Sequence, residues 1–347
     1  MQVAELRVGV VGVGSRTVHG EAWARTVVEM PSLRLVGVTD DDEEAAQRTA
    51  KALGVKNLGT DPRAVLEAED VDIAIVNSVD HRHEEDVNAA LDAGKHVITD
   101  KPLGVDGTGA ARIARKSREK GLKVAIGHVF RFAPSCQFVK KRAEAGDLGK
   151  LFQVEAGYVH DLRRVWKLTP WRTDPKRPQD PWFGGALHPI DLVQWIGGEI
   201  SEVCAVENKA TSRDEHPLAD NQILLLKFAS GAVGRVWNTF GIRQSPEFSP
   251  FCNAFGDRGS CLASLQRNAV EFHIDWGVGP VSGPITVPFA PGVSLNRLLI
   301  EDFLEAVRKD GRPLIDAEEG ARAMSVVDAA VKSVKSGRFE RVQVPVI

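Results

Sequence analysis

The segment Gly9-Val-Val-Gly12-Val-Gly14-Ser15-Arg16-Thr17 decides the fold, because it joins a short apolar run to a helix-like stretch. Glycine at such a junction lets the backbone approach a pyrophosphate, and the helix N-terminus favours the negative charge. Gly12 and Gly14 match the first two positions of G-x-G-x-x-G, whereas Thr17 stands at the third. The segment predicts a dinucleotide-binding loop made of Gly12, Gly14, Ser15, Arg16 and Thr17, with a ligand-free tight turn as the alternative.

Around this segment, from residue 6 to about residue 126, short apolar runs alternate with amphipathic stretches. The runs are rich in Val and Ile and nearly continuous in apolarity, as expected of parallel strands buried on both faces. The expected strands are 6–13, 33–39, 71–77, 95–99 and 122–126, and the expected helices are 17–30, 42–53, 84–93 and 107–120. This order predicts an α/β fold that begins with a Rossmann-type, doubly wound parallel sheet.

Beyond residue 127 the alternation stops, and consecutive strands with short turns predict a large, mainly antiparallel open sheet. The expected strands are 151–160, 202–209, 222–228, 232–240, 251–255 and 260–265; the expected helices are 134–145, 186–196, 295–309 and 317–335. Residues 162–182 carry four prolines and three tryptophans and are expected to form a loop. We therefore predict a dinucleotide-binding domain over residues 1–127 and an α+β substrate-binding domain over 128–347, whose C-terminal helices are placed to pack back on the first domain.

The composition excludes several classes of protein. The 347 residues carry 44 Lys and Arg against 47 Asp and Glu, a net charge of -3, which argues against a basic face for nucleic acid. No run approaches the roughly 18 uninterrupted apolar residues that a membrane helix needs, and the N-terminus has no apolar signal core. We expect a cytoplasmic protein with neither nucleic-acid nor membrane partners.

Cysteine, tyrosine and histidine usage narrows the chemistry further. The chain has no CxxC pair, so reduced thiols are expected rather than a disulfide framework or a zinc site. Tyr158 is the single tyrosine and Leu162 stands four positions later, which excludes the Tyr-x-x-x-Lys pair of short-chain dehydrogenases. His81 and His83 open an expected helix with no cysteine and no spaced carboxylate set, so we expect capping and cofactor contacts from them and no metal.

The second expected strand ends in Thr39-Asp40-Asp41-Asp42. An acidic side chain at this point accepts hydrogen bonds from a ribose 2′-hydroxyl and repels a 2′-phosphate, so Asp40 predicts NAD rather than NADP as the cofactor. Capping of the next helix is the alternative role for these aspartates. Arg16 is an argument for NADP instead, because a cation beside the adenosine site tolerates the 2′-phosphate of that cofactor.

Five ordered segments carry a family resemblance. The most specific is Ala90-Leu-Asp-Ala-Gly-Lys-His-Val-Ile-Thr-Asp100-Lys101-Pro102, and the others are Gly127-His-Val-Phe-Arg131-Phe-Ala-Pro134, Gly146-Asp-Leu-Gly-Lys150, Trp171-Arg172 and Gly185-Ala-Leu-His188-Pro-Ile-Asp191. Together they resemble the glucose-fructose oxidoreductases, inositol dehydrogenases and their relatives, the Gfo/Idh/MocA family, over essentially the whole chain. The resemblance implies hydride exchange between NAD and a carbinol carbon of a sugar, cyclitol or similar polyol.

Oxidation of an alcohol requires a base for the hydroxyl proton beside the nicotinamide. The resemblance assigns this proton relay to Lys101, at the carboxyl end of an expected strand, and to His188, whose ordinary pKa lies near neutrality. Asp191 stands one helical turn beyond His188 and is expected to hold the imidazole or contact a substrate hydroxyl, with a surface salt bridge as the alternative. The other cofactor contacts that the resemblance implies are Ser78, Val79, His83, Asp100, Lys101, Pro102, Arg131, Trp171 and Arg172.

Two positions depart from the family pattern. Gly184 stands where many of these dehydrogenases carry an aspartate four residues before the histidine, and Val79 replaces a proline. Without that aspartate the relay rests on Lys101 and His188, and two other functions stay open: an enzyme that oxidises a sugar transiently to permit elimination or glycoside cleavage, and a catalytically silent NAD-sensing protein. The resemblance also implies a homo-dimer or homo-tetramer formed through the C-terminal sheet.

Overall fold

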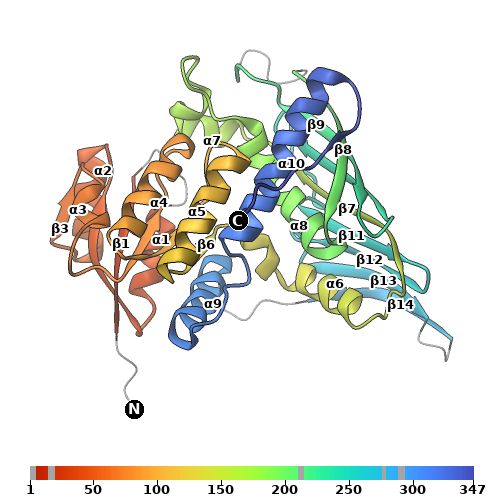
Figure 1. The fold of residues 1–347 in the computed structure, drawn as a ribbon, viewed down its shortest axis with the longest axis horizontal. Coiled ribbons are helices and arrows are strands. Elements are labelled where there is room, and N and C mark those ends of the chain that lie inside the picture. The colour runs from red at the N-terminus through yellow and green to blue at the C-terminus, as the bar shows by residue number, and fades with distance from the viewer. Residues whose placement is uncertain (1–4, 15–19, 210–214, 276–278, 288–293) are drawn as a thin grey trace.

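The computed structural model describes residues 5–14, 20–209, 215–275, 279–287 and 294–347. Two sheets stand side by side, a six-stranded one from the N-terminal part of the chain and a nine-stranded one from the rest (Figure 1). Within the described ranges, no helix is long and apolar enough to cross a membrane.

The first sheet is parallel throughout, in the order β3-β2-β1-β4-β5-β6. Its strands are β1 (Leu6–Val11), β2 (Leu33–Thr39), β3 (Asn57–Gly59), β4 (Ile73–Val76), β5 (His96–Thr99) and β6 (Val124–Ile126). The predicted Rossmann-type sheet is confirmed, and the order reverses between β1 and β4, the point where such sheets bind ligands. The short strand β3 was not predicted, because three residues carry too little periodicity to recognise.

The helices that cover this sheet are α1 (Gly20–Val28), α2 (Glu43–Leu53), α3 (Arg63–Leu66), α4 (His83–Asp92) and α5 (Gly107–Lys120). Local signals set their ends. The Asp106 carboxylate accepts the Gly109 N–H and begins α5, and Gly121 ends it in the left-handed conformation, with φ 66°.

The second sheet has the order β14-β13-β12-β11-β7-β10-β9-β8-β15. Its strands are β7 (Leu151–Val159), β8 (Ile200–Asn208), β9 (Asn221–Phe228), β10 (Val233–Thr239), β11 (Phe251–Gly256), β12 (Gly259–Ser264), β13 (Ala269–Asp275), β14 (Pro280–Thr286) and β15 (Glu340–Arg341). The predicted mainly antiparallel sheet is confirmed, and the one departure among these pairings is the parallel pair β7 and β10. Strands β13 and β14 extend the sheet beyond the predicted ones. In β14 two prolines and Gly283 interrupt the apolar alternation, whereas in β13 Val270, Phe272 and Ile274 alternate with polar residues, a signal that the sequence analysis missed.

After β6, the described residues form five α-helices: α6 (Pro134–Glu144), α7 (Arg163–Leu168), α8 (Leu187–Gly197), α9 (Leu295–Lys309) and α10 (Ala317–Ser336). Helix α9 buries Leu299, Phe303 and neighbouring side chains in one apolar cluster with β1. Helix α10 runs between α5 and β8 (Figure 1). Its Asp328 carboxylate accepts the Gly107 N–H at 2.8 Å. The C-terminal helices therefore pack back on the first sheet.

Residues 162–182 are not a plain loop, contrary to expectation. They contain α7 (Arg163–Leu168), a 3-10 turn η3 (Pro170–Thr173) and the start of a π-helical turn η4 (Trp182–Ala186). The prolines permit this because Pro170 occupies the first position of its turn, where no N–H is needed.

Helix α10 begins at an N-cap that predicts a measurable stability effect. The Asp316 carboxylate accepts the backbone N–H groups of Glu318 at 3.0 Å and Glu319 at 3.1 Å. Asp316→Ala is expected to lower the free energy of unfolding by about 1 kcal/mol in urea titrations, because a cap acceptor is lost. Asp316→Asn keeps the acceptor and serves as the control; equal stability of the two variants would contradict the capping role.

Candidate active site

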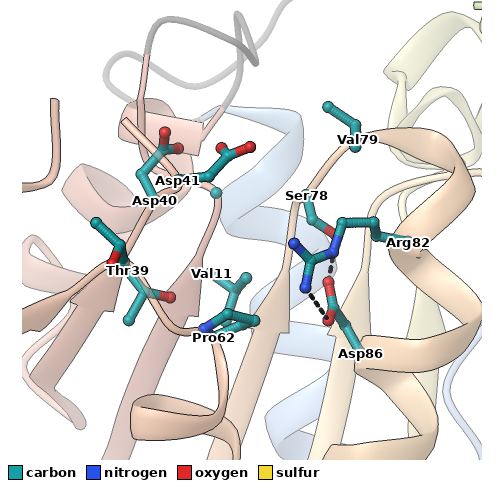
Figure 2. Close-up of a pocket in the computed structure, with 11 residues that line it drawn as sticks. Val11, Thr39, Asp40, Asp41, Pro62, Ser78, Val79, Arg82 and Asp86 are labelled. Carbon is teal, nitrogen blue, oxygen red and sulfur yellow. Dashed lines mark hydrogen bonds and ion pairs between the residues drawn. The ribbon is translucent and has the colours of Figure 1, made fainter. Parts of the chain in front are cut away.

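A first cavity opens at the carboxyl ends of β1, β2 and β4, where the strand order reverses (Figure 2). Of the predicted cofactor residues, Gly12, Asp40, Ser78 and Val79 line it. Ser15, Arg16 and Thr17 lie outside the described residues. The position at the switch point of a parallel sheet is the one where a dinucleotide binds in this architecture.

The glycines of the loop are required by close backbone approach. Gly12 has φ 82°, and a Cβ on it would lie 2.1 Å from the Asn77 carbonyl oxygen. A Cβ on Gly14 would lie 2.6 Å from the Asp40 carboxylate, whose other oxygen accepts the Gly14 N–H at 2.7 Å. A side chain at Gly12 would displace the backbone after β4, and one at Gly14 would displace the Asp40 carboxylate that holds the loop.

Asp40 therefore holds the glycine loop as well as facing the cavity. Its Oδ1 accepts the Asp42 N–H at 3.0 Å, and burial raises the pKa of its carboxyl above the ordinary value despite these backbone bonds. The helix cap is Asp42, whose carboxylate accepts the Ala45 N–H at 3.2 Å. The capping alternative thus applies to Asp42, while Asp40 remains at the cavity wall.

Arg82 and Asp86, which the sequence did not single out, complete the opposite wall. The Ser78 hydroxyl donates to Asp86 at 2.6 Å, and the Arg82 guanidinium lies 3.8 Å from the same carboxylate (Figure 2). Their position after a strand end was the available signal, since the carboxyl edge of the sheet is where contacts gather.

His83 is a linker between loops and does not line either cavity described here. It is 1% exposed, and its two ring nitrogens lie 2.8 Å from the carbonyl oxygens of Ser78 and Pro102. Each contact is a hydrogen bond when that nitrogen carries a proton. His83 thus fastens the loop after β4 to the segment that carries Lys101.

A second cavity, of about 260 Å³, lies between the two sheets and contains the predicted proton relay. Asp100 and Lys101 line it from the end of β5, and His188 lines it from α8. Tyr158 and His160 reach it from β7 and the residue after it. The fold therefore brings both predicted relay residues to one cavity from segments far apart in the chain.

The Lys101 amine is fixed to the turn that precedes His188. Its Nζ donates to the carbonyl oxygens of Gly184 at 2.8 Å and Phe183 at 3.2 Å, both in the π-helical turn η4. Lys101 is 9% exposed, and burial lowers the pKa of its amine, with Arg172 acting in the same direction and Asp100 and Asp80 opposing. The amine is therefore more readily neutral than an ordinary lysine.

The His188 ring is packed among aromatic groups. Its centroid lies 4.6 Å from that of Phe130 and 5.4 Å from that of Tyr158. Burial raises the pKa of Tyr158 to about 12, so its hydroxyl stays protonated and can donate a hydrogen bond. In the sequence, Tyr158 served only to exclude the Tyr-x-x-x-Lys pair, and it was not predicted as a site residue. No local sequence signal marks it, because its neighbours in the cavity come from distant segments.

Trp171 and Arg172 form one unit, and Arg172 alone of the two lines the cavity. The Arg172 guanidinium lies 4.9 Å from the centroid of the Trp171 ring and donates to the side-chain oxygen of Gln179. Burial lowers the pKa of Arg172, against the opposing effects of Asp80 and Asp100. Asp80 and Gln179 were not predicted, and both line this cavity.

Asp191 and Arg131 pair with each other beneath the site. Arg131 Nη2 donates to Asp191 at 2.6 Å and to Glu319 at 2.8 Å, while its Nε donates to the second oxygen of Asp191 at 2.9 Å. Both partners of the first pair are 1% exposed, and neither lines the two cavities. The structure thus places Asp191 as the partner of a buried guanidinium, outside the lining of the second cavity.

No group of three or more His, Cys, Asp or Glu that could hold a metal ion occurs in the part of the chain that the structure describes. The cysteines Cys136, Cys204, Cys252 and Cys261 carry free thiols.

A parallel, Rossmann-ordered sheet with a glycine loop, and a cavity between it and a second sheet that is lined by a lysine from the first sheet's edge and a histidine from α8, define a dinucleotide-dependent oxidoreductase. Residues 6–128 match the model of the oxidoreductase family's NAD-binding Rossmann fold, and residues 140–344 match that of its C-terminal alpha/beta domain. The chain belongs to the Gfo/Idh/MocA oxidoreductase family. Its first domain is an NAD-binding domain, which confirms the resemblance and the predicted class of cofactor.

Several relatives are named as dehydrogenases of cyclitols and sugars, and another, at 29% identity, as 4-carboxy-2-hydroxymuconate-6-semialdehyde dehydrogenase of Sphingobium sp.. Inositol 2-dehydrogenase 1 of Saccharopolyspora erythraea is 27% identical, over 96% of this chain and 95% of that protein. Levoglucosan dehydrogenase of Pseudarthrobacter phenanthrenivorans is 25% identical, over 94% of this chain and 96% of that protein.

Solved structures show the same fold over nearly the full length. Levoglucosan dehydrogenase in complex with NADH and levoglucosan superposes with a TM-score of 0.86 at 21% identity, covering 97% of this chain and 99% of the other. An oxidoreductase from Agrobacterium radiobacter in complex with NAD+, L-tartaric acid and magnesium also gives 0.86, at 16% identity and 98% and 99% coverage.

The buried pair predicts that Asp191 acts through stability. Asp191→Asn removes one charge of the pair without changing the volume, and the free energy of unfolding is expected to fall by roughly 3–5 kcal/mol, because the Arg131 charge loses its buried partner. Glu319→Gln, at a side chain that is 29% exposed, is the control with a smaller loss. Urea denaturation measures both. A stable Asp191→Asn protein that has lost turnover would instead return Asp191 to the proton relay.

Proposed function

We propose that the protein is an NAD(H)-dependent oxidoreductase that transfers hydride between nicotinamide and a secondary hydroxyl of a sugar- or cyclitol-like polyol. The observation that carries the proposal is the convergence of Lys101 and His188 on one cavity between the two sheets. The names of the relatives, inositol and levoglucosan dehydrogenases, support this substrate class.

The residues of the first cavity suit NAD. The glycine loop permits close backbone approach, and Asp40 stands at the end of β2, where a ribose hydroxyl donates to a carboxylate. When bound, NAD supplies the acceptor for the hydride that leaves the carbinol carbon.

Lys101 is the proposed base for the substrate hydroxyl. Burial lowers the pKa of its amine, so the neutral form that accepts a proton is populated closer to neutral pH than in an ordinary lysine. Two carbonyl oxygens hold Nζ at the cavity wall and stabilise the ammonium that forms. His188 is proposed to exchange the proton onward, and the Tyr158 hydroxyl to donate to a substrate oxygen.

The mixture of rings and polar groups in the cavity also suits a polyol. Phe130 and Tyr158 offer apolar surface to the C–H face of a ring, while Arg172 and Asp80 offer a donor and an acceptor to its hydroxyl groups. Assays on a panel of cyclitols and sugars, following NADH absorbance beside product analysis, test the proposal. Stoichiometric NADH supports it; product without NADH indicates transient oxidation; neither indicates an NAD-sensing protein.

We further propose that the open face of the second sheet forms the interface of a homo-dimer or homo-tetramer. Val206 on β8, Leu225 on β9 and Val233 on β10 are 62%, 52% and 52% exposed. Exposed apolar side chains gathered on one sheet face favour burial against another chain. A cytoplasmic location also remains a prediction.

NAD is expected to bind at least tenfold more tightly than NADP. A tenfold ratio corresponds to about 1.4 kcal/mol, which repulsion between Asp40 and a 2′-phosphate together with a charge-assisted ribose contact supplies. Calorimetric titration of both cofactors measures the ratio of their affinities. In the Asp40→Asn variant we expect the preference for NAD over NADP to be smaller. Equal affinities for the unaltered protein would remove Asp40 from cofactor selection.

Lys101→Ala is expected to lower kcat/KM by roughly 10²–10⁴ while leaving NAD affinity nearly unchanged, because general-base contributions are of that size and Lys101 lies outside the first cavity. Lys95→Ala is the matched control: Lys95 is also buried and donates to a carbonyl, that of Ala68, away from the second cavity. The control should lose stability but retain turnover. Full activity of Lys101→Ala would refute the assigned base.

A further inference from the structure

The space beside Gly184 is occupied by the side chain of Gln179. A Cβ on Gly184 would lie 2.8 Å from the Gln179 Oε1 and 2.9 Å from its Cδ. Gly184 is not among the glycines with positive φ, so the obstacle to a side chain there is Gln179 and not the backbone. A side chain at residue 184 would therefore have to displace the Gln179 amide, which fills the volume beside Gly184.

Gln179 is held in one orientation by two charged neighbours. It is 4% exposed; its Nε2 donates to Asp80 Oδ2 at 2.7 Å, and its Oε1 accepts from the Arg172 guanidinium. Its backbone N–H also donates to the Arg172 carbonyl at 3.0 Å. Since an amide nitrogen donates and an amide oxygen accepts, the order Arg172, Gln179, Asp80 permits a single placement of the amide.

This three-residue chain forms part of the wall of the cavity that contains Lys101. The Lys101 amine is anchored to the Gly184 carbonyl, and Gln179 packs on the same residue. Asp80 thus presents a carboxylate to the cavity from the loop after β4. The Gln179 amide, which is itself bound by the Arg172 guanidinium, holds that carboxylate in place. A carboxylate so placed acts on the charge of a neighbouring ammonium.

We propose that Asp80, positioned by Gln179 and Arg172, acts together with Asp100 as a carboxylate that tunes the Lys101 amine, at a site where Gly184 offers none. The inference rests on the proposed function. In alcohol oxidation the hydroxyl O–H bond would break and its proton would pass to the neutral Lys101 amine. The C–H bond would break at the same time, its hydrogen would leave with the electron pair as hydride to bound NAD, and the C=O bond would form. Asp80 is a positioning residue that stabilises the ammonium formed in this step.

The charges around Lys101 predict the direction in which its pKa shifts when each of them is removed. Burial is the largest influence on the pKa of Lys101 and lowers it; Asp100 and Asp80 raise it, and Arg172 lowers it. The titratable and charged groups that face the amine or line its cavity are Asp80, Asp100, His128, Tyr158, His160, Arg172 and His188. Removing Asp80 or Arg172 must therefore move the pKa of Lys101 in opposite directions.

The first experiment measures that pKa without turnover, from the chemical shift of Nζ in isotope-labelled lysine, assigned with Lys101→Arg. Asp80→Asn keeps an acceptor for Gln179 and is expected to lower the pKa by about one unit, a tenfold change in proton affinity; Arg172→Gln is expected to raise it. Asp174→Asn is the control: it removes an exposed charge two residues after Arg172 and should leave the pKa of Lys101 unchanged. An unshifted pKa in Asp80→Asn overturns the proposal.

The second experiment moves the carboxylate. In the Asp80→Asn protein, kcat for the best polyol of the panel is expected to fall by at least tenfold, and the rising limb of the pH profile to move to lower pH. Adding Gly184→Asp together with Gln179→Ala supplies a carboxylate at 184 and the room for it, and is expected to recover most of the loss. Gly184→Asp alone, which collides with Gln179, is expected to recover nothing.

Failure of the inference and failure of the proposed function give different results. If the unaltered protein oxidises no polyol, the proposed function fails, while the Lys101 titration still decides whether Asp80 tunes the amine. If turnover is present but Asp80→Asn changes neither the pKa nor kcat, the inference alone fails. Melting temperatures of all variants separate these outcomes from loss of folding.

Discussion

The hydrogen bonds from the buried Lys101 amine to the carbonyl oxygens of Phe183 and Gly184 are the contact on which the rest of the site depends. A charge removed from water is costly unless it is hydrogen-bonded, so the amine at the end of β5 must find acceptors across the cavity. The π-helical turn supplies them from the segment that leads into α8. This contact ties the edge of the parallel sheet to the second half of the chain and sets His188 on the same cavity.

Close packing at that turn then restricts what can stand around it. A Cβ on Gly185 would lie 2.3 Å from Asn238 Oδ1, and one on Gly184 would meet Gln179. The second sheet and the Gln179 loop therefore press directly on the backbone of η4. The resulting wall presents Asp80, Gln179 and Arg172 to the cavity in place of a carboxylate from the turn itself.

Several residues that the family resemblance placed in the site make structural contacts that join the segments around the cavity. His83 joins the loop after β4 to the Pro102 carbonyl, and Arg131 and Asp191 neutralise one another below the cavity. Helical spacing correctly put Asp191 on a turn next to His188, but spacing does not say which partner a carboxylate faces. That was decided by Arg131, which arrives from a segment sixty residues earlier in the chain.

The sequence by itself determined the parallel sheet, the glycine loop with Asp40 at the next strand end, and Lys101 at the carboxyl edge, because continuous apolar runs and helix-length intervals are local patterns. It could not show β14, where Pro280, Gly283 and Pro284 interrupt the apolar alternation and pairing with β13 makes the strand. Nor could it place Tyr158, Gln179 and Asp80 around Lys101, since they come from β7, a proline-rich segment and the loop after β4. Only the packing of one sheet against the other brings these segments to a common cavity, and that long-range arrangement has no local periodicity.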